Sequence, residues 1–379
     1  AAGVSRRLKL WALLRAHTSW NALRLDEVPE HAVILFSSGS ESLPKAVPLT
    51  HANILTNIRD VLEVVPIEDC DVLVGMLPPF HSFGLTITTV LPLCTGLRTV
   101  YHPNPTEAVL LARVIETHRV SVMVGTPAFL GGIVRAARPA QLASLRLAVT
   151  GAEKCPPAVH DALRACCPGA VVVEGYGITE CSPVVSANRP GHVVPGSIGT
   201  LMPSVEGLVV HHETGAPLPP GETGMLLVRG PSVFAGYLNF EGDSPFVEAC
   251  GSTWYRTGDL VRLDADGILW FEGRLKRFVK IGGEMISLPA IEAALLPHFS
   301  KAGDEGPPLA VDAVVAGGSP EIVLYSIRSL ERDQVNAILR EAGFSPLYYV
   351  RRVVEVPAIP VLGTGKTDYR ALAGQSAEA

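Results

Sequence analysis

The chain has 379 residues, of which 47% are apolar and 18% charged, and its formal net charge at pH 7 is −6. This composition excludes a disordered protein, and the negative charge argues against nucleic acid as the main ligand. No apolar run approaches the length of about 18 residues that a membrane-spanning helix needs, so we expect a globular chain of two or more domains.

The N-terminal stretch 1–20 combines basic residues with an apolar patch, as a signal peptide would. Arg15, His17 and the lack of a small-residue cleavage site favour an amphipathic helix instead. The seven cysteines show no Cys-x-x-Cys pair and no metal-ligand spacing. They predict a reduced, cytoplasmic protein with buried thiols.

Short β-branched runs alternate with helical stretches in the first half of the chain. The predicted strands are 33–36, 71–77, 121–125, 145–151 and 170–177, and the predicted helices are 50–64, 106–118 and 156–167. Strands that alternate with helices in this way predict βαβ units and a mostly parallel sheet.

From about residue 196 the pattern changes to short strands and Gly-Pro turns, which predicts a small β-barrel or sandwich appended to the α/β core. After Gly273 a third pattern predicts a smaller α+β domain, with helices near 288–296 and 331–342 and strands near 311–315, 321–327 and 350–356. We therefore expect a large domain over 1–273 and a C-terminal domain over 274–379.

The stretch ILFSSGSESLPKAVPLTH, residues 34–51, ends an apolar run in small hydroxyl residues and places Lys45 a few residues later. Small residues let backbone N–H groups approach an anion, hydroxyls donate to it and a lysine neutralises it, which predicts a phosphate loop. A hairpin turn rich in Ser and Pro is the open alternative. The stretch is not a Walker loop, because the Gly-Lys-Ser/Thr ending is absent.

Two other stretches carry candidate site residues at strand ends. In LPPFHSFGL, residues 77–85, His81 lies between two phenylalanines, and taken alone it indicates a loop histidine with an ordinary hydrogen-bond partner. In EGYGITECSPVVSAN, residues 174–188, glycines allow a flat ring to approach, Tyr176 can stack on that ring and Glu180 can hold a hard cation.

The segment 254–287 contains Asp259 after a glycine at a predicted strand start, a position where a carboxylate can bind a ribose diol. Residues 264–267 indicate a hairpin turn, and Arg274, Lys276 and Lys280 lie at the predicted domain junction. Lys366 lies in the glycine-rich segment GTGKTD, where a lysine near the C-terminus is ordinarily solvated.

Taken together, these segments resemble the adenylate-forming superfamily of acyl-CoA synthetases, luciferases and peptide-synthetase adenylation domains. The serine-rich stretch resembles its phosphate loop, TGAE (150–153) and GYGITE (175–180) its adenine and magnesium segments, YRTGDL its ribose segment, GRLKRFVKIGGE its hinge, and GTGKTD its catalytic-lysine loop. The order and spacing of the segments agree from about residue 33 to 372.

FHSFGL, GAEKC, EGYGITECSPVVSAN and RLKRFVKIGGEMISL are most similar to the acyl-acyl carrier protein synthetase domain of bifunctional 2-acylglycerophosphoethanolamine acyltransferases and to its stand-alone relatives. Fatty acyl-CoA ligases are the next most similar group. Ser42 and Ala46 occupy positions where the family usually has glycine, and the phosphate loop begins unusually early in the chain. We therefore expect an adenylate-forming fold that is shortened at its N-terminus.

The resemblance implies that ATP and Mg²⁺ activate a fatty acid to an acyl-adenylate, which then passes to a phosphopantetheine thiol. The implied catalytic residues are Lys366, Lys276 as the hinge, Lys280, and His81 as a gate to the acyl pocket. The implied nucleotide-binding residues are Ser37, Ser38, Gly39, Ser40, Lys45, Gly151, Ala152, Glu153, Gly175, Tyr176, Gly177, Thr179, Asp259 and Arg274, with Glu180 as the metal ligand.

The acceptor implied first is acyl carrier protein, with CoA second. Carrier proteins are acidic, and of the basic residues at the junction Arg277 is the candidate for docking. Membrane association through an acyltransferase partner is a further expectation. A nonenzymatic nucleotide-binding relative and a purely structural protein remain alternatives, and pyrophosphate release separates the enzyme from both.

Overall fold

A computed structural model of the chain describes residue 11 and residues 28–37, 44–301, 306–316, 319–361 and 367–376. The predicted N-terminal helix lies outside these residues, apart from Trp11. Among the residues that the structure describes, no helix combines the length and the apolar character that crossing a membrane requires.

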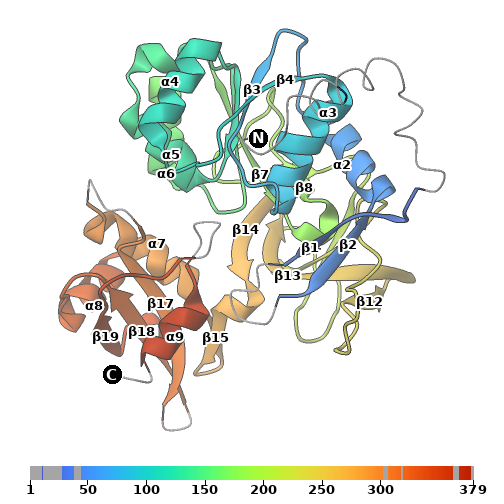
Figure 1. Ribbon diagram of the computed structural model, residues 1–379. Helices are drawn as coiled ribbons and strands as arrows, with labels where there is room; N and C mark the ends of the chain where they lie inside the picture. Colours follow the sequence, from blue (N-terminus) through green and yellow to red (C-terminus); the bar gives the residue numbers. More distant parts are fainter. Residues whose placement is uncertain are drawn as a thin grey trace.

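A seven-stranded sheet forms the centre of the first half of the chain, in the order β4-β3-β5-β6-β7-β8-β9 (Figure 1). Strands β4 to β7 run parallel, whereas β8 and β9 are antiparallel to their neighbours. The bounds are β3 Val72–Gly75, β4 Arg98–Tyr101, β5 Val122–Gly125, β6 Leu147–Thr150, β7 Val171–Gly177, β8 Val184–Ala187 and β9 Thr200–Leu201. The predicted parallel α/β core is confirmed.

Helices cover both faces of this sheet, as a parallel sheet requires. Figure 1 shows α4, α5 and α6 together on one side and α2 with α3 on the other. The bounds are α2 His51–Val64, α3 Leu91–Thr95, α4 Ala108–His118, α5 Pro127–Ala136 and α6 Pro157–Cys166. Because successive strand residues point to opposite faces, Val72, Val74, Met123 and Ala148 pack under α4–α6 (the packed face), whereas Leu73, Val122, Val124 and Leu147 face α2.

Two local features shape the α2 side. Thr50 begins α2 with a capping box, in which its side chain accepts from the Asn53 N–H at 3.1 Å and its own N–H donates to Asn53 Oδ1 at 2.9 Å. Before α3 the chain forms a π-helix, η2, over Gly84–Val90. A Cβ on Gly84 would lie 2.1 Å from the Pro78 carbonyl oxygen, so only glycine allows the π-helix to begin against this loop.

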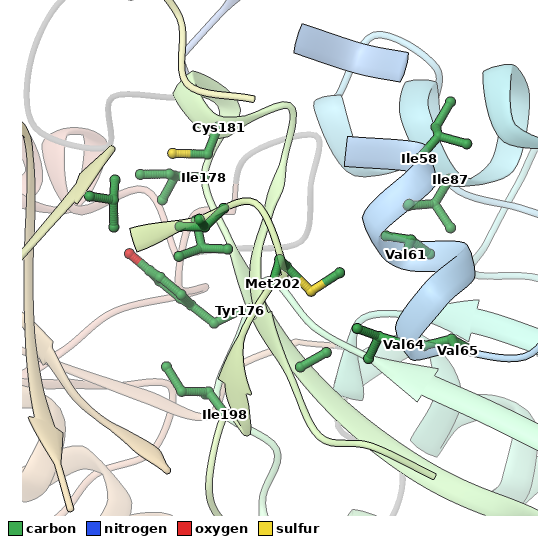
Figure 2. Close-up of a cluster of buried hydrophobic side chains, with 14 of the residues drawn as sticks. Ile58, Val61, Val64, Val65, Ile87, Tyr176, Ile178, Cys181, Ile198 and Met202 are labelled. Carbon is green, nitrogen blue, oxygen red and sulfur yellow. The ribbon is translucent and has the colours of Figure 1, made fainter. Parts of the chain in front are cut away.

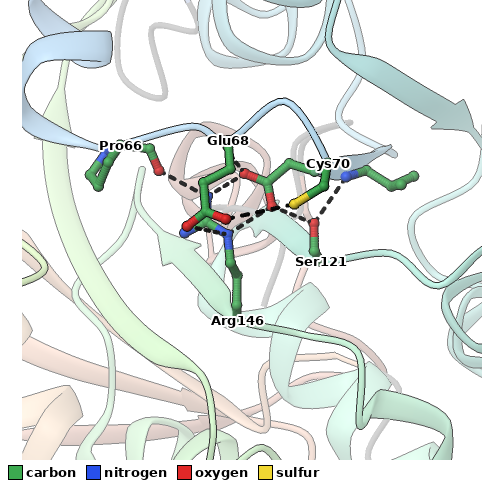
Figure 3. Close-up of polar contacts among 7 residues, drawn as sticks. Pro66, Glu68, Cys70, Ser121 and Arg146 are labelled. Carbon is green, nitrogen blue, oxygen red and sulfur yellow. Dashed lines mark hydrogen bonds and ion pairs between the residues drawn. The ribbon is translucent and has the colours of Figure 1, made fainter.

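The amino ends of three neighbouring strands are joined by a polar network (Figure 3). Asp71 accepts from Ser121 Oγ and from Arg146 Nε, both at 2.7 Å, and Arg146 Nη2 also contacts this carboxylate. Burial would raise the pKa of Asp71, but the hydrogen bonds from Arg146, Glu68 and Ser121 lower it below its ordinary value. The carboxyl ends of these strands lie at the opposite edge of the sheet, where the candidate site is.

The apolar run at 33–36 differs from its prediction as part of the parallel sheet. It belongs to β1 (His31–Phe36), which pairs antiparallel with β2 (Ala46–Thr50) in a separate two-stranded sheet, and most of its residues are exposed. The Ser37 N–H donates to the Lys45 carbonyl at 2.9 Å, which continues the hairpin. The serine-rich stretch therefore lies between two hairpin strands and does not follow a buried one.

The predicted β region after residue 196 is a five-stranded antiparallel sheet whose order, β10-β11-β13-β12 with β14 beside β13, does not close into a barrel. The bounds are β10 Glu206–Val210, β11 Thr223–Arg229, β12 Phe246–Ala249, β13 Ser252–Leu263 and β14 Leu269–Arg274. Asp259 lies inside β13 and not at a strand start, and the predicted turn at 264–267 joins β13 to β14.

The C-terminal elements gather on one side of the molecule in Figure 1, joined to the rest through β14 and β15. A hairpin, β15 Phe278–Ile281 with β16 Glu284–Ser287, precedes the three-stranded sheet β17 Leu309–Ala316, β18 Ser319–Ser326 and β19 Arg352–Glu355. The helices are α7 Leu288–Phe299, α8 Arg332–Glu341 and α9 Tyr369–Ser376. The expected α+β composition is confirmed, and the boundary at 273/274 stays a prediction.

Candidate functional site

The carboxyl ends of β6 and β7 form the floor of the candidate site. Thr150 and Glu174 are paired across these strands, so Gly151 and Gly175 follow side by side. A Cβ on Gly151 would lie 3.1 Å from the Gly175 carbonyl oxygen and 3.6 Å from the Phe83 ring. Glycine at 151 therefore lets the loop after β6 approach both neighbours.

The next residue, Ala152, has a left-handed backbone with φ of 70°. This conformation costs a residue with a Cβ about 1 kcal/mol, and such strain gathers at functional sites. Glu153 completes the segment and is half-buried.

Tyr176, Asp259 and Arg274 meet at one side of this floor. The Tyr176 hydroxyl donates to Asp259 Oδ2 at 2.6 Å, and Arg274 Nε lies 3.3 Å from Asp259 Oδ1. Asp259 and Arg274 are cross-strand partners on β13 and β14, and the Asp259 residue is only 1% exposed. Burial and then the Asp259 charge raise the pKa of Tyr176 well above its ordinary value, so this phenol remains a donor.

Glu180 and Lys45, far apart in the sequence, meet at Tyr237. The Tyr237 hydroxyl donates to Glu180 Oε1 at 2.7 Å, and Lys45 Nζ lies 4.6 Å from the centre of the same ring and 4.1 Å from that of Phe240. Burial and the Glu180 charge raise the pKa of Tyr237 above its ordinary value, which keeps it protonated. The structure thus brings the predicted phosphate lysine and the predicted metal ligand to one place.

The sequence analysis did not identify Tyr237. Asn53 fixes its segment by donating from Nδ2 to the carbonyl oxygens of Pro231 and Val233, at 2.8 and 3.1 Å. The available signal was the spacing of Phe234, Tyr237 and Phe240 after a Gly-Pro turn, which places an aromatic residue at every third position.

The loop with His81 joins the site from the side of η2. Ser82 Oγ lies 3.3 Å from Thr179 Oγ1, and His81 Nδ1 accepts from the Phe83 N–H at 3.4 Å. Gly177 allows the chain to turn toward Thr179, because a Cβ there would lie 2.3 Å from the Pro183 carbonyl oxygen. The residue that follows the predicted gate His81 is therefore in contact with Thr179, the predicted α-phosphate residue.

An apolar cavity opens beside these residues. Its volume is about 90 Å³, and its lining includes His81, Phe83, Gly151, Gly175 and Tyr176. In Figure 2, Val61 and Ile87 lie on the helical side of the same apolar cluster, with Met202 and Tyr176 across from them. The arrangement places a nonpolar space directly next to a charged and hydroxyl-rich edge.

Glu174 is a buried carboxyl group directly before Gly175. Its Oε1 accepts from the Cys155 N–H at 2.9 Å. Burial raises the pKa of Glu174 to about 7, against smaller opposing effects of this hydrogen bond and of Lys154. The group therefore changes charge near neutral pH.

The basic residues that were predicted to cluster at the domain junction lie in different environments. Lys276 is exposed in the single turn Leu275–Arg277, and Lys280 pairs with Glu213 at 3.0 Å. Arg277, expected to dock a carrier protein, is instead buried. It donates to Glu292 at 3.0 Å and to the Val311 carbonyl at 2.8 Å. The docking prediction for Arg277 is therefore wrong, because its charge is neutralised inside the C-terminal elements.

Part of the predicted site lies outside the described residues. Ser38, Gly39, Ser40 and Ser42 of the serine-rich stretch and Lys366 of the C-terminal loop belong to this group. At the edge of the first segment, the Lys45 N–H donates to Ser37 Oγ at 3.2 Å.

The model of the AMP-binding enzyme family matches residues 13–238. A probable 4-coumarate–CoA ligase 3 from Dictyostelium discoideum is 30% identical over 361 residues, covering 91% of this chain and 63% of that protein. A long-chain-fatty-acid–CoA ligase from Bacillus subtilis (strain 168) is 31% identical over 307 residues, covering 77% of this chain and 51% of that protein. The chain thus spans less than two thirds of the length of these relatives.

Solved structures give the same result for the fold. The crystal structure of ATP-bound MatB from Rhodopseudomonas palustris superposes with a TM-score of 0.79 and 25% identity, covering 93% of this chain and 69% of that one. O-succinylbenzoate coenzyme A synthetase (MenE) from Bacillus subtilis, in complex with ATP and magnesium ion, has a TM-score of 0.77 at 23% identity, covering 90% of this chain and 69% of that one. With the family model matching more than half of its residues, the chain belongs to the AMP-binding enzyme family.

Proposed function

We propose that the chain uses ATP to activate a carboxylic acid and then transfers the acyl group to a thiol. In the first half-reaction a carboxylate oxygen attacks the α-phosphorus, and the bond from that phosphorus to pyrophosphate breaks. In the second, the thiol sulfur attacks the acyl carbon, AMP leaves and the thiol proton passes to solvent. The observation that carries this proposal is a pair of clusters at the carboxyl end of β7, with Lys45 and Glu180 meeting at Tyr237 and Asp259 bound to Tyr176, which itself lines the apolar cavity.

ATP is assigned to the carboxyl edge of the sheet. Gly175 and Tyr176 line the adenine, Asp259 and Arg274 the ribose, and Thr179 the α-phosphate. Lys45 takes the β- and γ-phosphates, together with Ser37, Ser38, Gly39 and Ser40. The ion pair between Arg274 and the buried Asp259 supports the ribose assignment, because the more exposed Arg274 side chain can move aside and open the carboxylate to hydroxyl donors.

Glu180 is the residue that would hold Mg²⁺. Its carboxylate offers more acceptor positions than the hydrogen bond from Tyr237 uses. Within the described ranges no three His, Cys, Asp or Glu side chains gather into a metal-binding group. That suits Mg²⁺, which proteins usually bind through one or two carboxylates with substrate phosphates completing the shell. The ion would neutralise negative charge on the phosphates.

In this proposal the C-terminal elements take two orientations, one for adenylation and one for thiol attack. Lys366 contacts the carboxylate and α-phosphate oxygens during adenylation, and a pivot at Lys276 then moves it away for thiol attack. Lys280 acts in one of the two orientations, and its ion pair with Glu213, on the loop after β10, supports a contact that changes with the pivot. This pivot separates the proposed domains 1–273 and 274–379.

CoA is the acceptor that we favour. The named relatives are CoA ligases, and the burial of Arg277 removes the physical support for docking an acidic carrier protein. Acyl carrier protein remains the second acceptor, to be assayed beside CoA at matched concentrations.

The decisive experiment is pyrophosphate release from ATP, Mg²⁺ and a panel of carboxylic acids, comparing the chain with Glu180→Gln. Release by the variant should fall about 10²–10³-fold, the scale of losing one group that stabilises charge in the transition state. Glu222→Gln, which changes an exposed glutamate, is the matched control and should retain full activity.

Nucleotide binding without pyrophosphate release from any acid would overturn the proposal in favour of a nonenzymatic nucleotide-binding protein. Equal activity in Glu180→Gln and the parent chain would instead reject Glu180 as the metal ligand.

A further inference from the structure

The shape of the apolar cavity narrows the class of acid beyond the proposed activity. Its wall on the sheet side consists of Leu73, Val122, Val124, Leu147 and Val149, which alternate with residues of the packed face. Val61 of α2, Val65 directly after this helix and Ile87 of η2 face them. The body of the cavity is therefore aliphatic on both sides.

The polar side chains of the lining all lie at one end. His81, Ser82, Thr150 and Tyr176 line the cavity at the carboxyl edge, and among its described lining residues there is no Asp, Glu, Lys or Arg. A second carboxylate at the far end would be buried without an opposite charge, which strongly disfavours its binding. A hydroxyl group on a deeply inserted aromatic ring would lose its hydrogen bonds with water and gain none.

Strand β6 provides a measure of depth. Leu147 and Val149 of β6 line the cavity, followed by Thr150 and Gly151 at its carboxyl edge, so the wall from Leu147 to the opening at Gly151 spans four residues. At about 3.3 Å per residue this is about 13 Å, the length of an extended chain of about ten carbons.

We infer that the cavity binds an unsubstituted aliphatic monocarboxylic acid of medium length, about eight to ten carbons, with the methyl end against Leu147 and Leu73. The orientation of the carboxyl group toward Thr179 and Glu180 rests on the proposed function. The depth and the polarity of the cavity do not.

The inference is tested by calorimetric titration of the full chain, without ATP, with straight-chain acids from butanoate to hexadecanoate. Each added methylene should tighten binding about fourfold until about eight to ten carbons, and longer acids should gain nothing further. Octanedioate should bind at least about 100-fold more weakly than octanoate, because its second charge is buried unpaired. Tighter binding of octanedioate or of 4-hydroxycinnamate than of octanoate, or affinity that keeps rising to hexadecanoate, would overturn the inference.

Variants of one wall residue test where the hydrocarbon chain of the acid lies. Val149→Phe places a ring in the middle of the cavity and should move the plateau to about six carbons or fewer. Val149→Leu, which adds one methylene, should reduce the chain length at the plateau by less. It keeps the test possible if Val149→Phe does not fold. Met123→Leu changes the packed face at similar volume and should leave the plateau where it is. An unchanged plateau in both Val149 variants would remove β6 from the acid site.

The same acids, assayed for pyrophosphate release, separate this inference from the proposed function. A plateau in binding with no release would leave the cavity assignment standing and overturn the proposed activation. Release that favours aromatic or dicarboxylic acids would support activation and overturn the assignment of a medium-length aliphatic acid.

Discussion

The two faces of the central sheet use the same strands for different purposes. On the packed face, Met123 and Ala148 lie against α4–α6, and the helices contribute Ile115, Leu130 and Ile133, all of them fully buried. On the other face (the cavity face), Val124 and Val149 line a cavity beneath α2 and η2. Since neighbouring residues of one strand serve the two faces, a shift of one residue in register would exchange a close-packed core for a binding surface. Stability and ligand binding should therefore be separable by substitutions one residue apart.

The largest difference in stability between variants of the two faces is expected on β5. Met123→Ala should lower the free energy of unfolding by about 2–5 kcal/mol, because it leaves a cavity in a close-packed region. Val124→Ala should cost about 1.5 kcal/mol, since it only enlarges a space that already exists. Urea denaturation measures both values. Equal losses would mean that the two faces are packed alike.

A smaller effect should come from Glu174, a carboxyl group that strand alternation places with Val172 on the packed face. Glu174 has its pKa raised to about 7 in the folded chain, against an ordinary value of 4.5. Below pH 4.5 the group is protonated in both states and costs nothing. As pH rises from 4.5 to 7 the unfolded state ionises first, so the folded chain loses up to about 3 kcal/mol.

Glu174→Gln should remove this loss, so the variant should be more stable than the parent chain at pH 8 and equal to it near pH 4.5. The check is a series of urea denaturations across that pH range. Parallel stability curves for the two proteins would show that burial does not perturb this carboxyl group.

The smallest contrast is expected on β6. Ala148→Leu adds volume to the packed face and should cost about 1–3 kcal/mol, whereas Val149→Leu extends into the cavity and should cost less than about 1 kcal/mol. Thermal or urea unfolding of the two single variants measures both losses of stability. A larger loss in Val149→Leu than in Ala148→Leu would contradict the division into two faces.

The strands and helices of this sheet were largely predictable, because β-branched runs and helical stretches alternate along the chain. The α5 helix escaped prediction, since Gly131 and Gly132 interrupt its pattern, and β4 is only four residues long. The partner of β1 could not be predicted either. An apolar run of that length suits a buried parallel strand as well as a hairpin, and only tertiary packing distinguishes them.

The candidate site could likewise be predicted only where its residues do not depend on tertiary packing. Tyr176 and Glu180 were identifiable because glycines mark the end of β7, and Asp259 because it follows Gly258, although it lies inside β13. Tyr237 was not, because its importance comes from contacts with Lys45 and Glu180, nearly two hundred and about sixty residues away. Arg277 was misplaced for a related reason: Glu292 and Asp312, which neutralise it, come near only when β17 packs on α7.

The π-helix over Gly84–Val90 has a consequence for how related chains diversify. Its hydrogen bonds span five residues, as in the bond from the Leu91 N–H to the Thr86 carbonyl, so it holds more residues than an α-helix of the same length. Loss of a single residue would let the segment close as an ordinary α-helix, rotating everything before the deletion by about 100° and turning Ile87 away from β6. A one-codon deletion at this helix is therefore expected to change which side chains line the apolar cavity, a change that comparisons of substitutions alone would overlook.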